Sequence, residues 1–149
     1  YCEGDTFLPA IALSDAARVR IYAVDASGEG YQVWSSKGRA VTWSSLKNEP
    51  VFRHPWLLTR TDDGSDTQLI VAAAPPDGDF GSGETDANIC RLTAPFHAAQ
   101  FPAPVALHMV SYQVADAGHR LCSGRGDAEK AAETKQRAEA MLAAAPDCP

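Results

Sequence analysis

The stretch ARVRIYAV, residues 17–24, alternates apolar and polar side chains and gives the first clear element of the fold. In an extended chain, successive side chains point to opposite faces. The apolar face carries Val19, Ile21 and Ala23, and the other face carries Arg18, Arg20 and Tyr22. This alternation predicts a half-buried β-strand.

The segment that follows, YQVWSSKGRAVTWSS (residues 31–45), is predicted to form a β-hairpin. A lysine–glycine pair at 37–38 suits a two-residue turn, because glycine accepts positive φ. In that register Trp34 lies opposite Val41, and Trp43 shares their face. Tryptophans on such a face are usually core, and a ligand groove is the alternative.

Further strands are expected downstream, separated by turn-forming residues. Residues 52–61 and 67–74 are interpreted as a second hairpin around the turn DDGSD. Residues 88–92 and 105–114 are interpreted as a short and a longer strand, and residues 120–122 as a continuation after the turn ADAGH. The body, residues 5–122, is therefore expected to contain about seven mainly antiparallel strands in a meander or a sandwich.

The chain changes character near its C-terminus, where good helix formers follow a glycine-rich approach. Asp127 is a candidate N-cap, Pro146 is a stop signal, and a helix is expected over about residues 128–145. Its apolar stripe is made mostly of small side chains: Ala131, Ala138, Met141, Leu142 and Ala145. The expected fold class is α+β, a single domain of residues 1–149 held by disulfides.

Four widely spaced cysteines, Cys2, Cys90, Cys122 and Cys148, favour two disulfides in an oxidising compartment over a zinc site. A helix of about 17 residues is roughly 25 Å long. The short segments flanking it would have to be fully taut to join Cys122 to Cys148, so that pair is disfavoured. Cys148 is expected to bond Cys2 or Cys90, and the choice stays open.

The charge balance excludes some classes of protein. The net charge is −6 across 149 residues, and no cluster of lysine and arginine is present to neutralise a nucleic-acid backbone. No apolar run approaches the roughly 18–20 residues of a membrane span. The start at Tyr1, without a charged or apolar leader, is interpreted as a mature exported form. The periplasm is the expected compartment, with secretion as the alternative.

The stretch VAAAPPDGDFGSGETDANIC, residues 71–90, is predicted to be a long surface loop. More than twelve residues without regular structure is unusual in a small domain and is often functional. The candidate partner-binding residues are Asp77, Asp79, Phe80, Glu84 and Asp86, with the aromatic ring as anchor. A solvated connection is the plainer interpretation, and the spacing of acids does not match an EF-hand calcium loop.

Other motifs carry little chemistry. The histidines at 54, 97, 108 and 119 have no metal-ligand spacing. The Ser44–Lys47 spacing resembles the SxxK element of penicillin-binding enzymes, but it is expected to end a strand and its partner motifs are missing. The tripeptide at 125–127 is RGD and is interpreted as the approach to the helix. No catalytic residue, metal or cofactor is assigned.

These features together favour a small exported protein-binding module without catalysis. Its most concrete form is an inhibitor or immunity protein that blocks a partner enzyme, such as a toxin or hydrolase, through the acidic glycine-rich loop. A small-molecule or lipid carrier with a tryptophan-lined face is the alternative, and an unrecognised hydrolase is a further one. A large apolar cavity would favour the carrier. The partner and the oligomeric state are left open.

Overall fold

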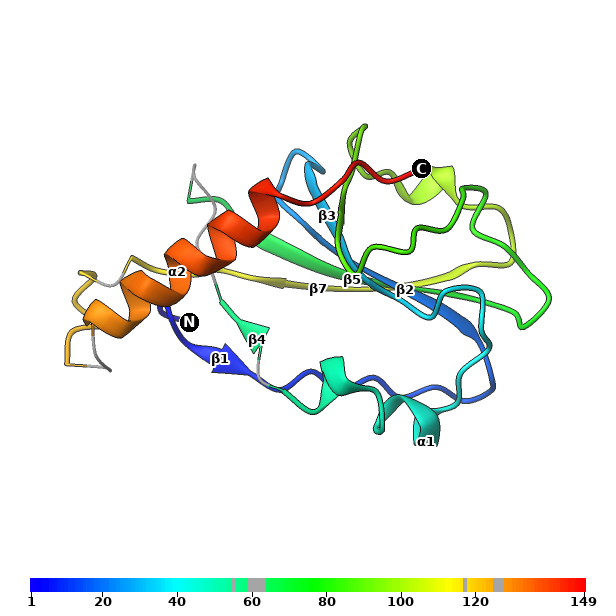
Figure 1. Cartoon of the computed structure of the whole chain (residues 1–149), viewed down its shortest axis with the longest axis horizontal. Coiled ribbons are helices and arrows are strands. Elements are labelled where there is room, and N and C mark those ends of the chain that lie inside the picture. The colour runs from blue at the N-terminus through cyan, green and yellow to red at the C-terminus, as the bar shows by residue number, and fades with distance from the viewer. Residues whose placement is uncertain (55, 59–63, 117, 125–127) are drawn as a thin grey trace.

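The computed structural model describes residues 1–54, 56–58, 64–116, 118–124 and 128–149 (Figure 1). Its strands are β1 (Thr6–Phe7), β2 (Arg18–Val24), β3 (Gly30–Ser35), β4 (Trp56–Leu57), β5 (Thr67–Ala74), β6 (Cys90–Arg91) and β7 (Ala106–Tyr112). Its helices are α1 (Trp43–Leu46) and α2 (Ala128–Ala143), with 3₁₀ turns η1 (Pro50–Phe52) and η2 (Ala98–Gln100).

The main sheet has five strands in the order β6-β3-β2-β5-β7, and each neighbouring pair is antiparallel. β1 and β4 form a separate two-stranded ribbon. The α+β class, the antiparallel sheet, the C-terminal helix and the disulfide bracing are confirmed. The strand order departs from a meander at the centre, where β5 pairs with β2 and not with β4.

β2 is a central strand that is buried on both faces, so the prediction of a half-buried strand is wrong. Val19 and Ile21 lie in one apolar cluster, as the alternation predicts. On the other face Tyr22 packs into a second cluster and Arg20 is only 2% exposed. The second face is covered because residues 75–105 fold back over it, which the local pattern of β2 does not encode.

The predicted hairpin over residues 31–45 is wrong beyond its turn. Lys37 and Gly38 do adopt positive φ, as a tight turn requires. β3 pairs instead with β2, and Val41 forms an isolated bridge with Ala17. The chain then enters α1, because Thr42 and the third helical residue cap each other's backbone and stabilise a helix start.

The second predicted hairpin also pairs differently. β4 pairs with β1, whereas β5 lies between β2 and β7. Residues 120–122 form a turn and not a strand. The predicted strands at 88–92 and 105–114 are present as β6 and β7. Asp62 and Asp63 of the predicted DDGSD turn, the N-cap at Asp127 and the RGD tripeptide fall outside the described residues.

α2 ends close to its predicted boundary and is tethered on both sides. Disulfides join Cys90 to Cys148, just beyond its end, and Cys2 to Cys122, just before its start. The disfavoured Cys122–Cys148 bond is absent, and Cys148 takes one of its two expected partners. The Glu3 carboxylate lies 2.9 Å from the Lys135 ammonium and raises the pKa of that lysine.

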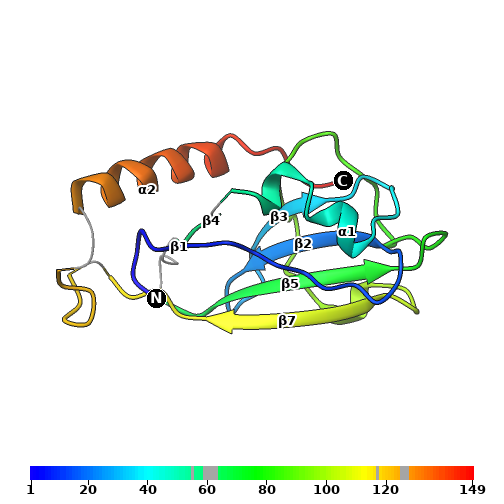
Figure 2. The ribbon, with the colours of Figure 1, turned by 90° about the horizontal axis from the view of Figure 1, so that it is seen from below.

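α2 lies at one end of the sheet and its apolar stripe is only partly buried. Figure 2 shows α2 beyond the end of the sheet at which β2 ends and β5 begins. Ala138 and Leu142 are half-buried, and Met141 is 55% exposed. Of the helices that the structure describes, none has the length and apolar character to cross a bilayer.

Candidate functional site

Residues 75–88 lie against the second face of the sheet, and Phe80 is the reason. Its side chain is only 3% exposed and belongs to the cluster with Tyr22 and Ile70. The ring lies 4.5 Å from the Arg20 guanidinium and packs edge-on against Phe101. The prediction that Phe80 is an exposed anchor for a partner is therefore wrong: the face of the sheet needs an apolar cover, and Phe80 supplies part of it.

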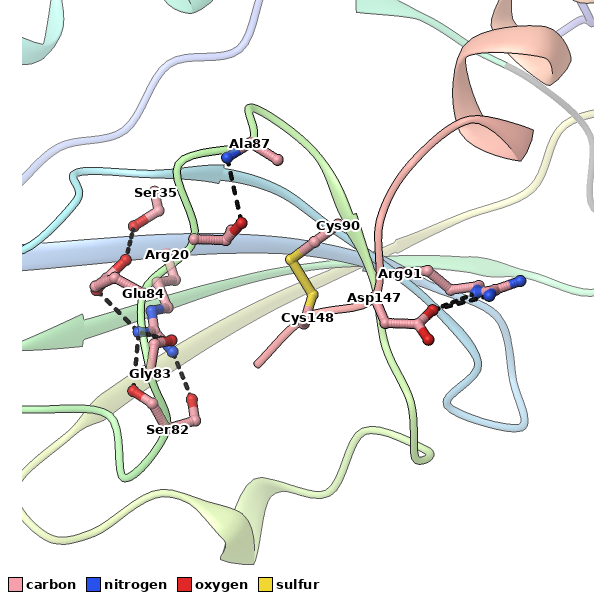
Figure 3. The surroundings of a disulfide bond; sticks show 11 residues. Arg20, Ser35, Ser82, Gly83, Glu84, Ala87, Cys90, Arg91, Asp147 and Cys148 are labelled. Carbon is pink, nitrogen blue, oxygen red and sulfur yellow. Dashed lines mark hydrogen bonds and ion pairs between the residues drawn. A yellow bond between two sulfur atoms is a disulfide. The ribbon is translucent and has the colours of Figure 1, made fainter.

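A buried arginine fixes the middle of the loop (Figure 3). The Arg20 guanidinium donates to the Ser82 hydroxyl at 2.6 Å, to the Gly83 carbonyl at 2.9 Å and to Glu84 Oε1 at 2.8 Å. The Ser35 hydroxyl donates to the other oxygen of Glu84 at 2.9 Å. Glu84 thus neutralises a buried charge, which is a structural role.

Arg20 also affects the pKa of Tyr22, its neighbour on this face of the sheet. Burial raises the pKa of Tyr22 above its ordinary 10.0, and the positive charge of Arg20 offsets part of that rise. A small pocket of about 130 Å³ beside Arg20 is lined also by Tyr22 and Gln32. Because Arg20 already has a carboxylate partner, the described lining of this pocket offers no free cation to a ligand.

The other three predicted loop residues remain at the surface. Asp77, Asp79 and Asp86 are exposed. Asp79 accepts a hydrogen bond from the Gly81 amide at 2.8 Å, and Lys37 donates to the Asp86 carbonyl at 2.9 Å. The loop therefore divides into an inward pair, Phe80 and Glu84, and three outward carboxylates. Within the described part of the chain, no group of three or more metal-ligating side chains gathers.

A second concave feature is a cleft of about 1190 Å³ between α2 and the sheet. The sheet contributes residues of β2, β3 and β5, and α2 contributes Ala138, Met141 and Leu142. We call this space the α2 cleft. Its apolar lining from the body of the protein includes Phe7, Tyr31, Val33, Val51, Trp56, Leu69, Ile89, Leu92, Pro95 and Tyr112.

The α2 cleft crosses the strands at one end of the sheet and differs between its two sides. On the β7 side, Phe7 packs on Trp56 at 5.7 Å and on Tyr112 at 6.4 Å between ring centroids. Burial raises the pKa of the Tyr112 hydroxyl, which fits an apolar wall. On the β3 side, the turn between β2 and β3 contributes Asp25 and Glu29.

The tryptophan face expected from the sequence does not form as a unit. Trp34 packs on Phe52 at 5.2 Å within the core, as the plainer interpretation holds. Trp43 lies on α1, 46% exposed, with the Lys47 ammonium over its ring. Only Trp56 lines the α2 cleft, where its indole N–H donates to the Val51 carbonyl at 2.8 Å.

The remaining sequence candidates do not converge on a catalytic arrangement. His54, His97, His108 and His119 are exposed and lie on separate segments. Ser44 lies on helix α1, so the prediction that the SxxK spacing ends a strand is wrong. The Thr42–Ser45 capping box explains that helix.

Sequence reasoning missed the α2 cleft, although one signal pointed to it. The apolar stripe of α2 consists mostly of alanine. Small side chains cannot fill the space that a standard helix-on-sheet packing would close. Comparisons with known proteins add no further guide: the chain matches no family model, no curated protein and no solved structure.

Proposed function

We propose that this protein is a non-catalytic carrier that binds a small apolar or amphipathic molecule in the α2 cleft. The observation that carries the proposal is the cleft itself, about 1190 Å³ lined mainly by aromatic and aliphatic side chains. Pockets for small molecules have volumes of about 300–1,000 Å³, mostly apolar walls and a few polar groups. The volume of the α2 cleft lies just above that range, so a drug-sized molecule fits within it.

The energetics support an apolar occupant. Leu69, Val33 and Trp56 are only half-buried in the free protein and face the cleft. A ligand that removes this surface from water gains about 25 cal/mol for each Å² of apolar area. The helix that closes the cleft is held by a disulfide at its C-terminal side, so closure is pre-organised and costs less entropy on binding.

The compartment is part of the proposal. Disulfides persist in oxidising environments, and both bonds here join segments distant in sequence. We place the carrier in the periplasm, with secretion from the cell as the alternative.

The test uses the neutral fluorescent probe N-phenyl-1-naphthylamine and two variants of α2. Ala138 lines the cleft, whereas Ala140 is exposed on the same helix and does not. Ala138→Phe places a ring in the cleft and should weaken probe binding about tenfold, equivalent to about 1.4 kcal/mol. Ala140→Phe is the matched control and should bind like the parent protein. Equal affinity in all three proteins, or no binding to the parent, contradicts the proposal.

A second candidate function is protein binding through residues 75–88, as an inhibitor or immunity protein. The observation that favours it is the fixation of this loop by the buried Arg20, which leaves Asp77, Asp79 and Asp86 exposed on a pre-organised backbone. Pre-organisation lowers the entropy cost of association. Exposed carboxylates favour a basic partner surface and raise the association rate.

This second candidate makes a separate prediction. A triple variant with asparagine at 77, 79 and 86 keeps Phe80 and Glu84 and should fold normally. If the loop binds a partner, affinity capture from native extracts should recover a protein with the parent and not with the triple variant. Recovery of the same proteins by both forms contradicts the candidate.

A further inference from the structure

We propose that the ligand of the α2 cleft carries a positive charge, as in a long-chain amine or quaternary ammonium compound. This inference rests on the proposed carrier function and adds the class of ligand. It is carried by the residues of the described lining that are charged at neutral pH: Asp25, Glu29, Glu139 and Arg91. Three of these are carboxylates and one is a guanidinium.

The single guanidinium is already occupied. Arg91 donates to the same Asp147 oxygen through Nε at 3.0 Å and through Nη2 at 2.8 Å. This contact raises the pKa of Arg91, with the hydrogen bond to Asp147 as its largest cause. Among the described lining residues, no unpaired cation is therefore left to meet a carboxylate or sulfate head group.

The three carboxylates differ in how far they already have hydrogen-bond or ion-pair partners. Asp25 accepts hydrogen bonds from the Ser27 and Glu29 amides and so stabilises the turn between β2 and β3. Glu139 has only a 3.9 Å contact with Lys135, whose ammonium is closer to Glu3. Glu29 is exposed and belongs to the lining from the same turn. Glu29 and Glu139 are thus the groups best placed to meet a cation.

The polarity of the cleft gives the ligand an orientation. Phe7, Trp56 and Tyr112 form the aromatic wall on the β7 side, where a hydrocarbon chain loses most contact with water. Glu29 lies on the β3 side together with Tyr31. The face of a tyrosine ring also attracts ammonium groups, through a cation–π interaction. The chain of the ligand therefore lies towards β7 and its charged head towards the β2–β3 turn.

The test compares three ten-carbon probes by isothermal titration calorimetry, each below its micelle concentration: decyltrimethylammonium, decanol and decanoate. The chain is constant, so differences in affinity report the head group. Decyltrimethylammonium should bind about tenfold more tightly than decanoate, with decanol between them, because each half-exposed ion pair contributes modestly.

Variants separate the charge from the cleft. The double variant Glu29→Gln with Glu139→Gln should weaken decyltrimethylammonium binding about threefold to fivefold and leave decanol binding unchanged. Glu133→Gln, an exposed position on α2 outside the lining, is the matched control and should change neither. Equal affinity for all three probes, or tightest binding of decanoate, overturns the charge inference while the carrier function stands. No binding of any probe overturns both.

Discussion

Replacement of Phe80 tests whether residues 75–88 are part of the core. The ring is 3% exposed, packs against Phe101 and lies over the Arg20 guanidinium. Truncation of a buried phenylalanine to alanine costs about 3–5 kcal/mol, because transfer energy is lost and a cavity remains. We expect Phe80→Ala to lower the free energy of unfolding by about this amount, a large share of the stability of a small domain.

The assay is urea unfolding of the oxidised protein, followed by circular dichroism. Phe80→Leu keeps an apolar side chain but removes the ring over the guanidinium, and should cost about 1–2 kcal/mol. Asp77→Ala is an exposed change in the same segment and should stay within about 0.5 kcal/mol of the parent. If Phe80→Ala is as mild as Asp77→Ala, the loop is not packed on the sheet and the reasoning fails.

Three further predictions concern the scaffold. Cys148→Ser opens the bond to Cys90 across a separation of 58 residues and should lower the stability measured in urea by about 4 kcal/mol by loop entropy; a loss below about 1 kcal/mol would count against the tether. Glu84→Gln removes the carboxylate partner of the buried Arg20 while the backbone carbonyls remain. The free energy of unfolding in urea should fall by about 1–2 kcal/mol. An unchanged urea midpoint would contradict the ion pair. Burial raises the pKa of Tyr22, so folding favours its protonated form. The stability that Tyr22 contributes is therefore present below pH 10 and is lost as the pH rises above 10. Tyr22→Phe should flatten that alkaline decline in stability, and an identical pH profile would contradict the shift.

The sequence predicted the elements of this fold better than their pairing. The alternation at residues 17–24 identified β2, because the apolar cluster behind Val19 and Ile21 imposes that period locally. The cover on the opposite face could not be foreseen, since it depends on Phe80 returning from a loop far along the chain. The hairpin over residues 31–45 failed for a local reason, the Thr42–Ser45 capping box.

The candidate site was the least predictable part. The glycines and acidic residues of 75–88 suggested a protruding loop, but Phe80 among them is buried in the core. The α2 cleft arises from residues on β1, β3, β4, β5 and a helix whose position depends on the Cys90–Cys148 bond. Periodicity reports which residues share a face of one element, whereas the distance between two elements follows from side-chain size and tethering.

The central claim, that the α2 cleft holds an apolar ligand, is tested most directly by an NMR titration of the ¹⁵N-labelled protein with decanol. The Trp56 indole N–H, which donates to the Val51 carbonyl inside the cleft, is the reporter. We expect saturable shifts of this resonance and of the Tyr31, Leu69 and Leu142 amides, with residues 77–86 unchanged. An unmoved Trp56 indole, or shifts confined to residues 77–86, would contradict the account.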